Sequence, residues 1–372
     1  MSTGFFFRSR ATKRPSPSLT TAAVKLLSLL LFMLATMAVA QQFTFTTNNG
    51  AITITGYTGP GGELTIPDTI NGLPVTAIGD HAFYADTSLT SVTIADSVTS
   101  IADYAFGACT NLTDSTMGNG VTSIGDHAFF SCISLRSIAI PKGVTSLRDY
   151  AFANCYGLIS VIIPDSVSSI GNETFFDCFS LGVMSIPNSV TNIGVLAFYG
   201  CALTSVTVPE NVTSIGSTTF GACHKLKSVR ISSSVTGIGA GAFTLCTSMS
   251  GVYFAGNAPA LLGPNVFGDD NKATVYYLSG ATGWGATFGG LPTALWLPQA
   301  QTADPSFGIR TNQFGFTISW ASDKVIIVEA TANLTHPAWA PVATNILTGG
   351  ASYFSDPQWR NYPARYYRLR SS

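Results

Sequence analysis

Seven cysteines are the residues of this chain whose type and spacing most directly suggest chemistry. They follow one another at intervals of 22 or 23 residues, at Cys109, Cys132, Cys155, Cys178, Cys201, Cys223 and Cys246. Thiols in such a series could pair as disulfides, bind a metal or pack as small apolar side chains. Seven cannot all pair, and side chains at one position of a regular repeat point in parallel rather than towards each other. We therefore expect free, buried thiols, with disulfides and a metal site as the alternatives.

Two series of polar side chains follow the same interval. One is acidic, Asp80, Asp103, Asp126 and Asp149, and the other alternates His81, Tyr104, His127 and Tyr150. A row of carboxylates could hold Ca²⁺, but no fixed pattern of further oxygen ligands accompanies it. We expect instead that each aspartate caps a short helical turn. The His and Tyr series leaves two interpretations open, surface packing or an aromatic recognition stripe.

Motifs of known catalytic sites are missing from the sequence, with one apparent exception. Residues 237–242, Gly-Ile-Gly-Ala-Gly-Ala, match a dinucleotide-binding fingerprint, but they lack the strand and helix that this motif requires. They stand where Ser-Ile-Gly-Asp-His-Ala-Phe stands elsewhere in the chain. No G-x-S-x-G, H-E-x-x-H or phosphate loop occurs. We expect a protein that is not an enzyme and that holds no cofactor and no metal.

The interval belongs to a 23-residue unit that recurs from about Val75 to Tyr277. Its central phenylalanine falls at Phe83, Phe106, Phe129, Phe152, Phe175, Phe198, Phe220 and Phe243. The one short step arises because Cys201-Ala-Leu203 has one residue fewer than Cys178-Phe-Ser-Leu181. Fixed apolar positions at such a period are the signature of a solenoid. One unit cannot offset the entropy of its own ordering, so neighbouring coils must share a core.

An alternating apolar pair in each unit predicts one short strand per coil. The pairs are Leu64/Ile66, Val92/Ile94, Ser115/Met117, Ile138/Ile140, Val161/Ile163, Met184/Ile186, Val206/Val208, Val229/Ile231, Val252/Phe254 and Val275/Tyr277. Stacked coils would align these strands in a parallel ladder. The predicted fold is a β-rich solenoid with almost every inward position apolar.

The pattern L-x-S-V-x-I-P-x-S-V-T-S-I-G-x-x-A-F-x-x-C resembles the BspA-type leucine-rich repeat family of bacterial secreted and cell-surface proteins. The resemblance extends over roughly Leu64 to Tyr277, with departures at individual positions. Gly118 and Ser232 replace the proline after the strand, Asp86 replaces the cysteine, and Ser115 weakens one strand. The resemblance implies a leucine-rich repeat solenoid. It also implies a binding function, since BspA-type proteins include adhesins that bind host matrix proteins.

The first 40 residues have the features of a signal peptide. Five basic residues precede an apolar run from Leu26 to Val39, and Ala38-Val39-Ala40 provides the cleavage signal before Gln41. The run of ~14 residues is short for an uncleaved membrane anchor. We expect cleavage, secretion to the cell surface or the extracellular space, and no stable membrane span in the mature chain. Cleavage would leave 13 basic and 19 acidic residues, so nucleic acid is not an expected partner.

The sequence on either side of the repeats predicts caps and a second module. Phe43/Phe45 and Ile52/Ile54 alternate around Asn48-Asn49-Gly50, which predicts an N-terminal β-hairpin cap. After the last repeat, residues 275–298 carry Trp284, Phe288 and Trp296, which we expect to close the other end. The predicted organisation is a signal peptide at 1–40, a capped solenoid at 41–298 and a small C-terminal β-rich module at 299–372.

The C-terminal module is predicted to begin with a polar linker, Gln299 to Pro305. Strands are expected at 314–320, 325–330, 353–354 and 365–369. The module carries six basic residues against four acidic ones. Two interpretations remain, a stabilising appendage or attachment to an anionic envelope surface.

The ladder of a solenoid offers a long face whose outward side chains are free to bind. These outward positions include Thr90, Thr93, Arg136, Ile159, Ile162, Thr207, Lys227, Arg230, Tyr253 and Tyr276. Arginine and aromatic side chains most often anchor interfaces, so we predict that an extracellular protein or glycan binds at Lys227, Arg230, Tyr253 and Tyr276. The alternatives are a passive structural component of the envelope or matrix and an accessory module of an extracellular enzyme.

Overall fold

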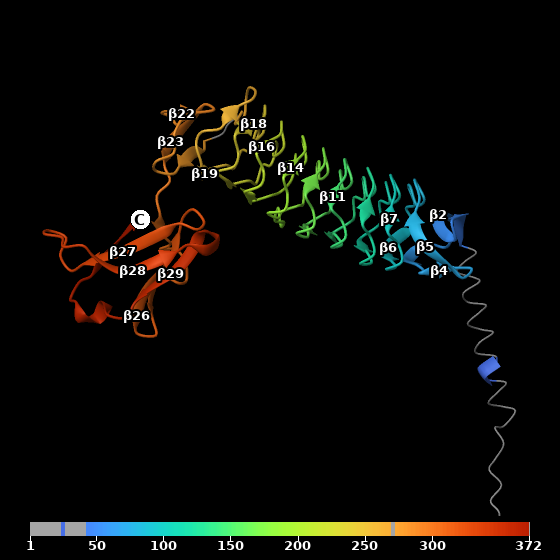
Figure 1. Cartoon of the computed structure of the whole chain (residues 1–372), viewed down its shortest axis with the longest axis horizontal. Coiled ribbons are helices and arrows are strands. Elements are labelled where there is room, and N and C mark those ends of the chain that lie inside the picture. The colour runs from blue at the N-terminus through green and yellow to red at the C-terminus, as the bar shows by residue number, and fades with distance from the viewer. Residues whose placement is uncertain (1–23, 27–41, 269–271, 372) are drawn as a thin grey trace, which may run out of the picture.

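The computed structural model describes residues 24–26, 42–268 and 272–371. The described chain forms a curved solenoid of stacked coils followed by a β-rich module at its C-terminal end (Figure 1). The predicted signal peptide lies outside the described residues, except for three. Over the described ranges, no helix is long and apolar enough to cross a membrane. The predicted fold class, a parallel-strand β-solenoid with a small C-terminal β module, is confirmed.

The predicted N-terminal hairpin is confirmed. Strands β1 (Phe43–Asn48) and β2 (Ala51–Tyr57) pair antiparallel. Asn49 and Gly50 connect them with positive φ values of 49° and 77°, as the tight turns favoured in hairpins require. Strand β2 then pairs in parallel with β5 (Leu73–Ile78), so the hairpin covers the exposed end of the first coil.

The predicted strands form the first of two ladders. Its members are β3 (Gly62–Ile66), β6 (Leu89–Ile94), β8 (Asp114–Thr116), β10 (Ser137–Ala139), β12 (Ser160–Ile162), β15 (Ser205–Val208), β17 (Ser228–Ile231), β19 (Gly251–Phe254) and β21 (Thr274–Tyr277). They pair in parallel with coil-to-coil register, for example Val229 with Val252. The strand predicted at Met184 and Ile186 is wrong. That coil makes only an isolated bridge between Ser160 and Val183.

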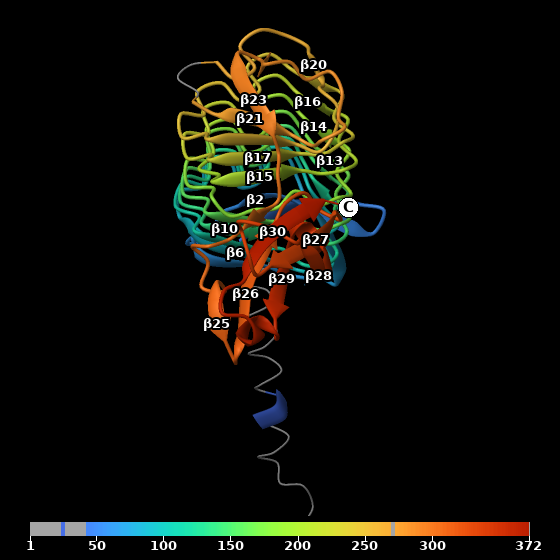
Figure 2. The same ribbon diagram turned by 90° about the vertical axis from the view of Figure 1, so that its left-hand side faces the viewer.

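A second ladder of very short strands, not predicted from the sequence, runs beside the first. It contains β7 (Ser100–Ile101), β9 (Ser123–Ile124), β11 (Ser146–Leu147), β13 (Ser169–Ile170), β14 (Asn192–Ile193), β16 (Ser214–Ile215), β18 (Gly237–Ile238) and β20 (Ala260–Leu261). Strand β5 begins this ladder, and β4 (Thr69–Ile70) pairs with β5 in an antiparallel turn. Figure 2 views the stack from its C-terminal end, with β15 and β17 on one side and β13, β14 and β16 on the other.

The predicted phenylalanine series forms a continuous stack inside the solenoid. Rings of successive coils lie 4.9 to 5.6 Å apart between centroids and are nearly parallel. The structure adds Phe267, whose ring lies 5.6 Å from that of Phe243. Phe267 follows Phe243 by 24 residues, so the interval of 22 or 23 residues did not identify it in the sequence. The stack and the two ladders together enclose one apolar core.

The segment around each Ala-Phe pair is a series of tight turns, so the predicted helical turns are wrong. Each coil places two residues at positive φ here, such as His127 at 57° and Ser131 at 55°. The aspartates do not cap helices. The main-chain N–H of Asn172 instead donates to Asp149 Oδ1 at 2.7 Å, and the main-chain N–H of Asp126 donates to Asp103 Oδ1 at 2.8 Å. Each of these carboxylates therefore joins its own coil to the next one.

Ser115 is a buried polar residue in the middle of the first ladder. Its hydroxyl oxygen has no hydrogen-bond partner, and its neighbours in register are Val92 and Ile138. We expect Ser115→Val to raise the free energy of unfolding by about 1 to 2 kcal/mol, because a buried unsatisfied hydroxyl is removed. Urea denaturation checks this, with Ser137→Val at an exposed ladder position as the control. A loss of stability would contradict it.

The C-terminal end of the solenoid is closed by β22 (Thr287–Phe288) and β23 (Leu291–Leu295). Trp284 stacks on Tyr277 at 5.2 Å, and Phe288 lies against Phe254 at 5.6 Å. The predicted closing role of Trp284 and Phe288 is confirmed. The prediction for Trp296 is wrong, since its side chain joins a second core that belongs mainly to the C-terminal module.

The C-terminal module consists of two small antiparallel sheets. One contains β24 (Gln299–Ala300), β25 (Gly308–Arg310), β26 (Gln313–Ser319) and β29 (Ala351–Asp356), and the other contains β27 (Val325–Thr331), β28 (Ala340–Ile346) and β30 (Tyr366–Ser371). Two short 3-10 turns, η1 (Thr348–Gly350) and η2 (Trp359–Asn361), join strands. The four predicted strands form, β25 and β28 were not predicted, and part of the predicted linker is strand β24. The division at residue 299 stays a prediction.

Candidate functional site

Three of the four predicted binding residues lie in one row of the first ladder. Arg230 pairs in register with Tyr253, and Tyr253 with Tyr276. The two tyrosine rings stack at 4.9 Å. Lys227 is exposed at the start of the same coil, whereas the other three side chains are half-buried. The ladder thus brings the predicted residues together on its outward face.

The core of the C-terminal module, which includes the side chain of Trp296, contacts this row. Trp296 lies 5.1 Å from the ring of Tyr253, and the Arg230 guanidinium lies 5.9 Å from the Trp296 ring. Trp320 Nε1 donates to the Trp296 carbonyl at 2.7 Å, and Tyr253 and Tyr276 pack against the module's core. Burial raises the pKa of Tyr253. The proposed binding of a partner at these residues stays a prediction, and their present contact is the chain's own module.

A cleft lies where the module meets the ladder. Its volume is about 520 Å³, and its lining includes Arg230, Trp296 and the charged residues Glu210, Asp323 and Lys324. Because two acidic and two basic residues line it, the cleft carries no net charge of one sign. We find no arrangement of these groups that points to one class of ligand.

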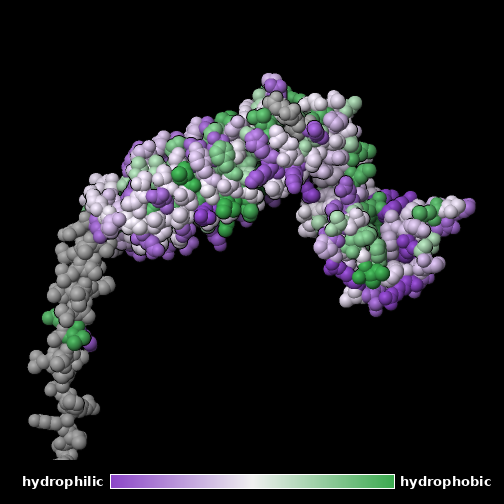
Figure 3. Space-filling model, turned by 180° about the vertical axis from the view of Figure 1, so that it is seen from behind, coloured by the Kyte–Doolittle hydropathy of each residue, from purple (hydrophilic) through white to green (hydrophobic). Residues whose placement is uncertain are grey.

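The middle of the ladder face carries exposed apolar side chains. Ile159, Ile162 and Val183 are 46%, 68% and 66% exposed, and we name these three residues the mid-ladder patch. Beside it, the exposed rings of Tyr156 and Phe179 stack at 5.3 Å. Figure 3 shows hydrophobic atoms on the lower edge of the middle of the solenoid. Contiguous apolar surface on a folded chain usually marks an interaction site.

The sequence contained a signal for this patch. Ile159 and Ile162 stand at outward ladder positions where other units carry small hydroxyl residues such as Thr90 and Thr93. Charged and aromatic side chains in the C-terminal coils are the stronger general signal for an interface, and they led the prediction there instead. Val183 was missed because its position is Ser in most units and lies beside the interruption of the ladder.

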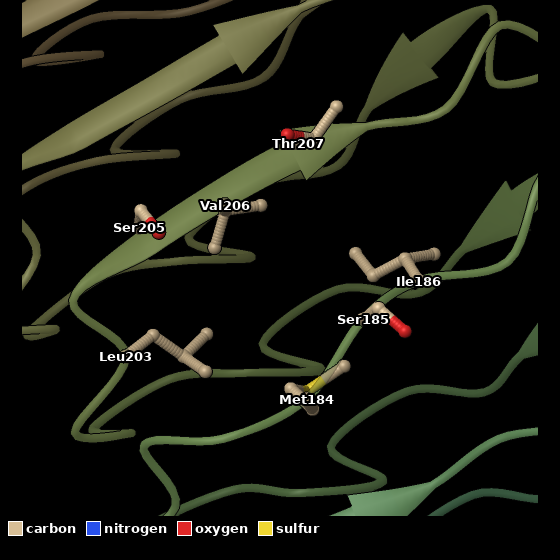
Figure 4. A pocket seen from close by; sticks show the side chains of 7 residues that line it. All are labelled: Met184, Ser185, Ile186, Leu203, Ser205, Val206 and Thr207. Atoms are coloured by element: carbon tan, nitrogen blue, oxygen red, sulfur yellow. The ribbon is translucent and has the colours of Figure 1, made fainter. Parts of the chain in front are cut away.

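Both ladders are interrupted together at the 22-residue coil. In the described chain, β14 does not pair with β16, and the segment at Met184 does not pair with β15. A gap of about 160 Å³ opens there onto the ladder face, lined by Met184, Ser185, Ile186, Leu203, Ser205, Val206 and Thr207 (Figure 4). The missing residue between Cys201 and Leu203 lies directly before β15, so the shortened turn accounts for the lost pairing.

All seven cysteines are free and buried, which confirms the predicted thiols. Each S–H donates to the carbonyl of the phenylalanine of the preceding coil, at 3.0 to 3.3 Å. Burial raises the pKa of Cys109, Cys155 and Cys246 to about 12. It raises the pKa of the other four well above the ordinary value. The thiols therefore stay protonated and unreactive at neutral pH.

We expect the native protein to show almost no reaction with a thiol reagent at pH 8, and the unfolded, unreduced protein to show close to seven free thiols. Burial and a raised pKa both suppress the thiolate, which is the reacting form. Titration with a chromogenic disulfide, with and without guanidinium, measures both numbers. A single thiol in the unfolded protein would mean three disulfides and contradict the structure.

The His and Tyr series forms a second, outer stack. Its ring centroids are separated by 4.9, 4.3 and 4.5 Å in the order His81, Tyr104, His127 and Tyr150. Because each inner ring has a neighbour on both faces, these faces are not available to a ligand. Surface packing is therefore the role that the geometry supports. Desolvation lowers the pKa of His127, although four nearby carboxylates oppose the shift.

The described residues contain no group of three or more His, Cys, Asp or Glu side chains that could hold a metal ion. In the C-terminal module, Glu329 pairs with Arg368 at 2.7 Å and with Arg370 at 3.1 Å. The two arginines share one carboxylate, which offsets only one of their two positive charges, so both interpretations of the module stay predictions. The exposed apolar side chains described above make the ladder face the candidate site.

A curved parallel ladder with an outward face and a repeat of about 23 residues defines a leucine-rich repeat scaffold. The sequence profile described as "BspA type Leucine rich repeat region" matches the chain in six copies, over residues 76–201 and 145–274. The chain belongs to the BspA-type leucine-rich repeat family, as the sequence pattern predicted.

Solved structures of bacterial leucine-rich repeat proteins are similar to this chain. A leucine-rich repeat protein of T. pallidum is 30% identical, with a TM-score of 0.42, over 56% of this chain and 89% of that chain. A leucine-rich cell surface protein of Faecalibacterium prausnitzii is 27% identical, with a TM-score of 0.40, over 65% and 88%. A search among curated proteins finds no matching relative.

Proposed function

We propose that this protein is exported and binds an extracellular protein through its ladder face, without catalysing a reaction. The observation that carries the proposal is the mid-ladder patch. Its three aliphatic side chains are exposed to solvent on the outward face of the ladder, which takes no part in the packing of one coil on the next. Removing them from water would favour association by roughly 25 cal/mol for each Å² buried. The aliphatic side chains at the centre of the patch favour a protein partner over a glycan.

The surroundings of the patch support a protein partner. Tyr156 and Phe179 extend the apolar area along the edge of the ladder, and aromatic side chains are frequent anchors of interfaces. Thr207 and Arg136 lie exposed on the same face and would form a polar rim. An apolar centre with a polar rim is the usual anatomy of a protein interface.

A binding experiment tests the proposal. The mature chain serves as bait for a cell-surface extract, and the purified partner is titrated by calorimetry. Ile162→Ser with Val183→Ser is expected to weaken binding at least tenfold. Thr93→Ser with Thr116→Ser, on the same outward row, should leave it unchanged. Unchanged affinity of the patch variant, with its fold intact by circular dichroism, would overturn the proposed site.

Export is tested separately. Mass spectrometry of secreted or surface-released protein should find Gln41 as the first residue. Secreted material that retains residues 1–40 would refute cleavage. A screen against glycoside and peptide substrates addresses catalysis, and turnover abolished by a ladder-face substitution would overturn the non-catalytic assignment.

A further inference from the structure

The C-terminal module carries a pocket that shares no lining residue with the cleft at the ladder. Its volume is about 500 Å³, within the usual range of small-ligand sites. Aromatic rings provide much of its surface, from Phe314, Trp359, Tyr362 and Tyr367. A second pocket of about 530 Å³ adjoins it, because Phe314, Arg365 and Tyr367 line both. The two pockets together offer room for an extended ligand.

Contacts within the module hold these rings in place. Trp359 Nε1 donates to the Asn312 carbonyl at 3.1 Å. The Arg365 guanidinium lies 4.0 Å from the centroid of the Tyr362 ring, and Arg365 Nε lies 2.6 Å from Asp356 Oδ2. Side chains that are positioned in advance lose little conformational freedom when a ligand binds. Tyr362 is 38% exposed, so part of its ring remains accessible to a ligand.

The charged side chains around the pocket are mainly basic. Arg310 and Arg360 are exposed, and each directly follows a residue of the lining in the sequence. Within the described ranges, neither arginine makes an ion pair. Two of the module's four acidic residues, Glu329 and Asp356, are buried, and a third lines the cleft at the ladder. An anion that approaches the pocket therefore meets two guanidinium groups without a carboxylate partner.

We propose that this pocket binds an acidic polysaccharide, whose sugar rings carry carboxylate groups. The face of an aromatic ring carries partial negative charge, so it attracts the C–H groups on the face of a sugar ring. Arginine binds a carboxylate through two parallel hydrogen bonds. A neutral glycan would leave both arginines unpaired, and an anionic lipid headgroup would make no use of fixed rings in a pocket. The acidic polysaccharide uses both features.

The inference goes beyond the proposed function, because the pocket and the mid-ladder patch have no residue in common. The chain would then have two binding surfaces with different ligands. The C-terminal module would hold it to a polysaccharide of the envelope or matrix. The ladder face would stay free for a protein partner.

The experiment uses the mature full-length chain and two labelled uronic-acid oligosaccharides, oligogalacturonate and oligoalginate, titrated by fluorescence anisotropy. We expect binding of at least one of them, weakening as salt is added because exposed charges are screened. Dextran, which is neutral, should compete at least tenfold less well than the unlabelled uronate. Polyglutamate, which has carboxylates but no sugar rings, should also compete at least tenfold less well.

Two double variants separate the contributions of the rings and the charges. Trp359→Ala with Tyr362→Ala, and Arg310→Gln with Arg360→Gln, should each weaken uronate binding at least tenfold. The matched control is Tyr353→Ala with Arg148→Gln. Tyr353 is 46% exposed and lines neither pocket, and Arg148 is exposed on the solenoid, so binding should not change. Circular dichroism establishes that each variant is folded.

The arginine variant keeps the test valid if loss of the two rings disturbs the module, because both of its side chains are exposed. No binding of either uronate, or equal competition by polyglutamate, would overturn the proposal. Binding to phosphatidylglycerol vesicles without binding to the uronates would assign the module to a membrane surface instead. The Ile162→Ser with Val183→Ser variant should bind the uronate like the wild type. Loss of uronate binding in that variant would place the glycan on the ladder face and overturn the pocket.

Discussion

Replacing Phe152 with alanine is expected to lower the free energy of unfolding by about 3 to 5 kcal/mol, because a whole ring leaves a closed core. The side chain is fully buried. Its ring lies 5.5 Å from that of Phe129 and 5.6 Å from that of Phe175. Removing it therefore breaks the aromatic stack on both sides, in the middle of an array whose stability comes from neighbouring coils.

Chemical denaturation followed by circular dichroism measures the loss. Cys155→Ala is the matched control from the same coil, since its side chain is equally buried but much smaller. That change should cost about 1 kcal/mol. A loss for Phe152→Ala as small as that of the control would show that neighbouring rings close over the cavity, contrary to the packing described.

Replacing Trp296 with alanine is expected to release the C-terminal module from the ladder. The indole is only 7% exposed, and it provides the ring that contacts Tyr253 and Arg230. Truncating a buried tryptophan costs about 3 to 5 kcal/mol, and here that cost falls on the contact between the two parts. The hydrogen bond from Trp320 uses the main chain of residue 296, so alanine can still accept it.

Two measurements detect the release of the C-terminal module from the ladder. Limited proteolysis should cleave the variant near residues 297–305 faster than the wild type. Burial raises the pKa of Tyr253, so spectrophotometric titration should show this pKa falling towards its ordinary value once the module leaves. Trp359→Ala, within the module and bonded to Asn312, is the control and should change neither. Unchanged protection of the Trp296 variant would contradict this contact.

The inward positions of the solenoid were predictable because one chain repeats them many times. Every copy must bury the same residues against its neighbours, so the Phe and Cys series mark the core without any knowledge of the fold. The hairpin was equally accessible, since Asn49 and Gly50 are a local signal for a tight turn. In both cases the information lies within a few residues or in a fixed period.

The errors arise where partners are distant in sequence. Asp149 was assigned to a cap within its own coil, but its carboxylate accepts from Asn172, 23 residues later. The pattern at Met184 and Ile186 is that of a strand, yet pairing depends on the length of the following turn. Trp296 packs in the core formed by the C-terminal strands and contacts Tyr253, and nothing in the local sequence distinguishes it from a closing cap.

The interrupted junction also determines how the array responds to tension. When the solenoid is pulled along its length, load passes between coils through two ladders and the turn-side bonds. At the junction between Phe198 and Phe220 neither ladder pairs. The load there falls on the turn-side bonds, such as that from the Phe198 amide to the Thr219 carbonyl, and on the bond from Asn211 Nδ2 to the Asn188 carbonyl. The array should therefore open at this junction first, before the coils on either side, which pair through at least one ladder.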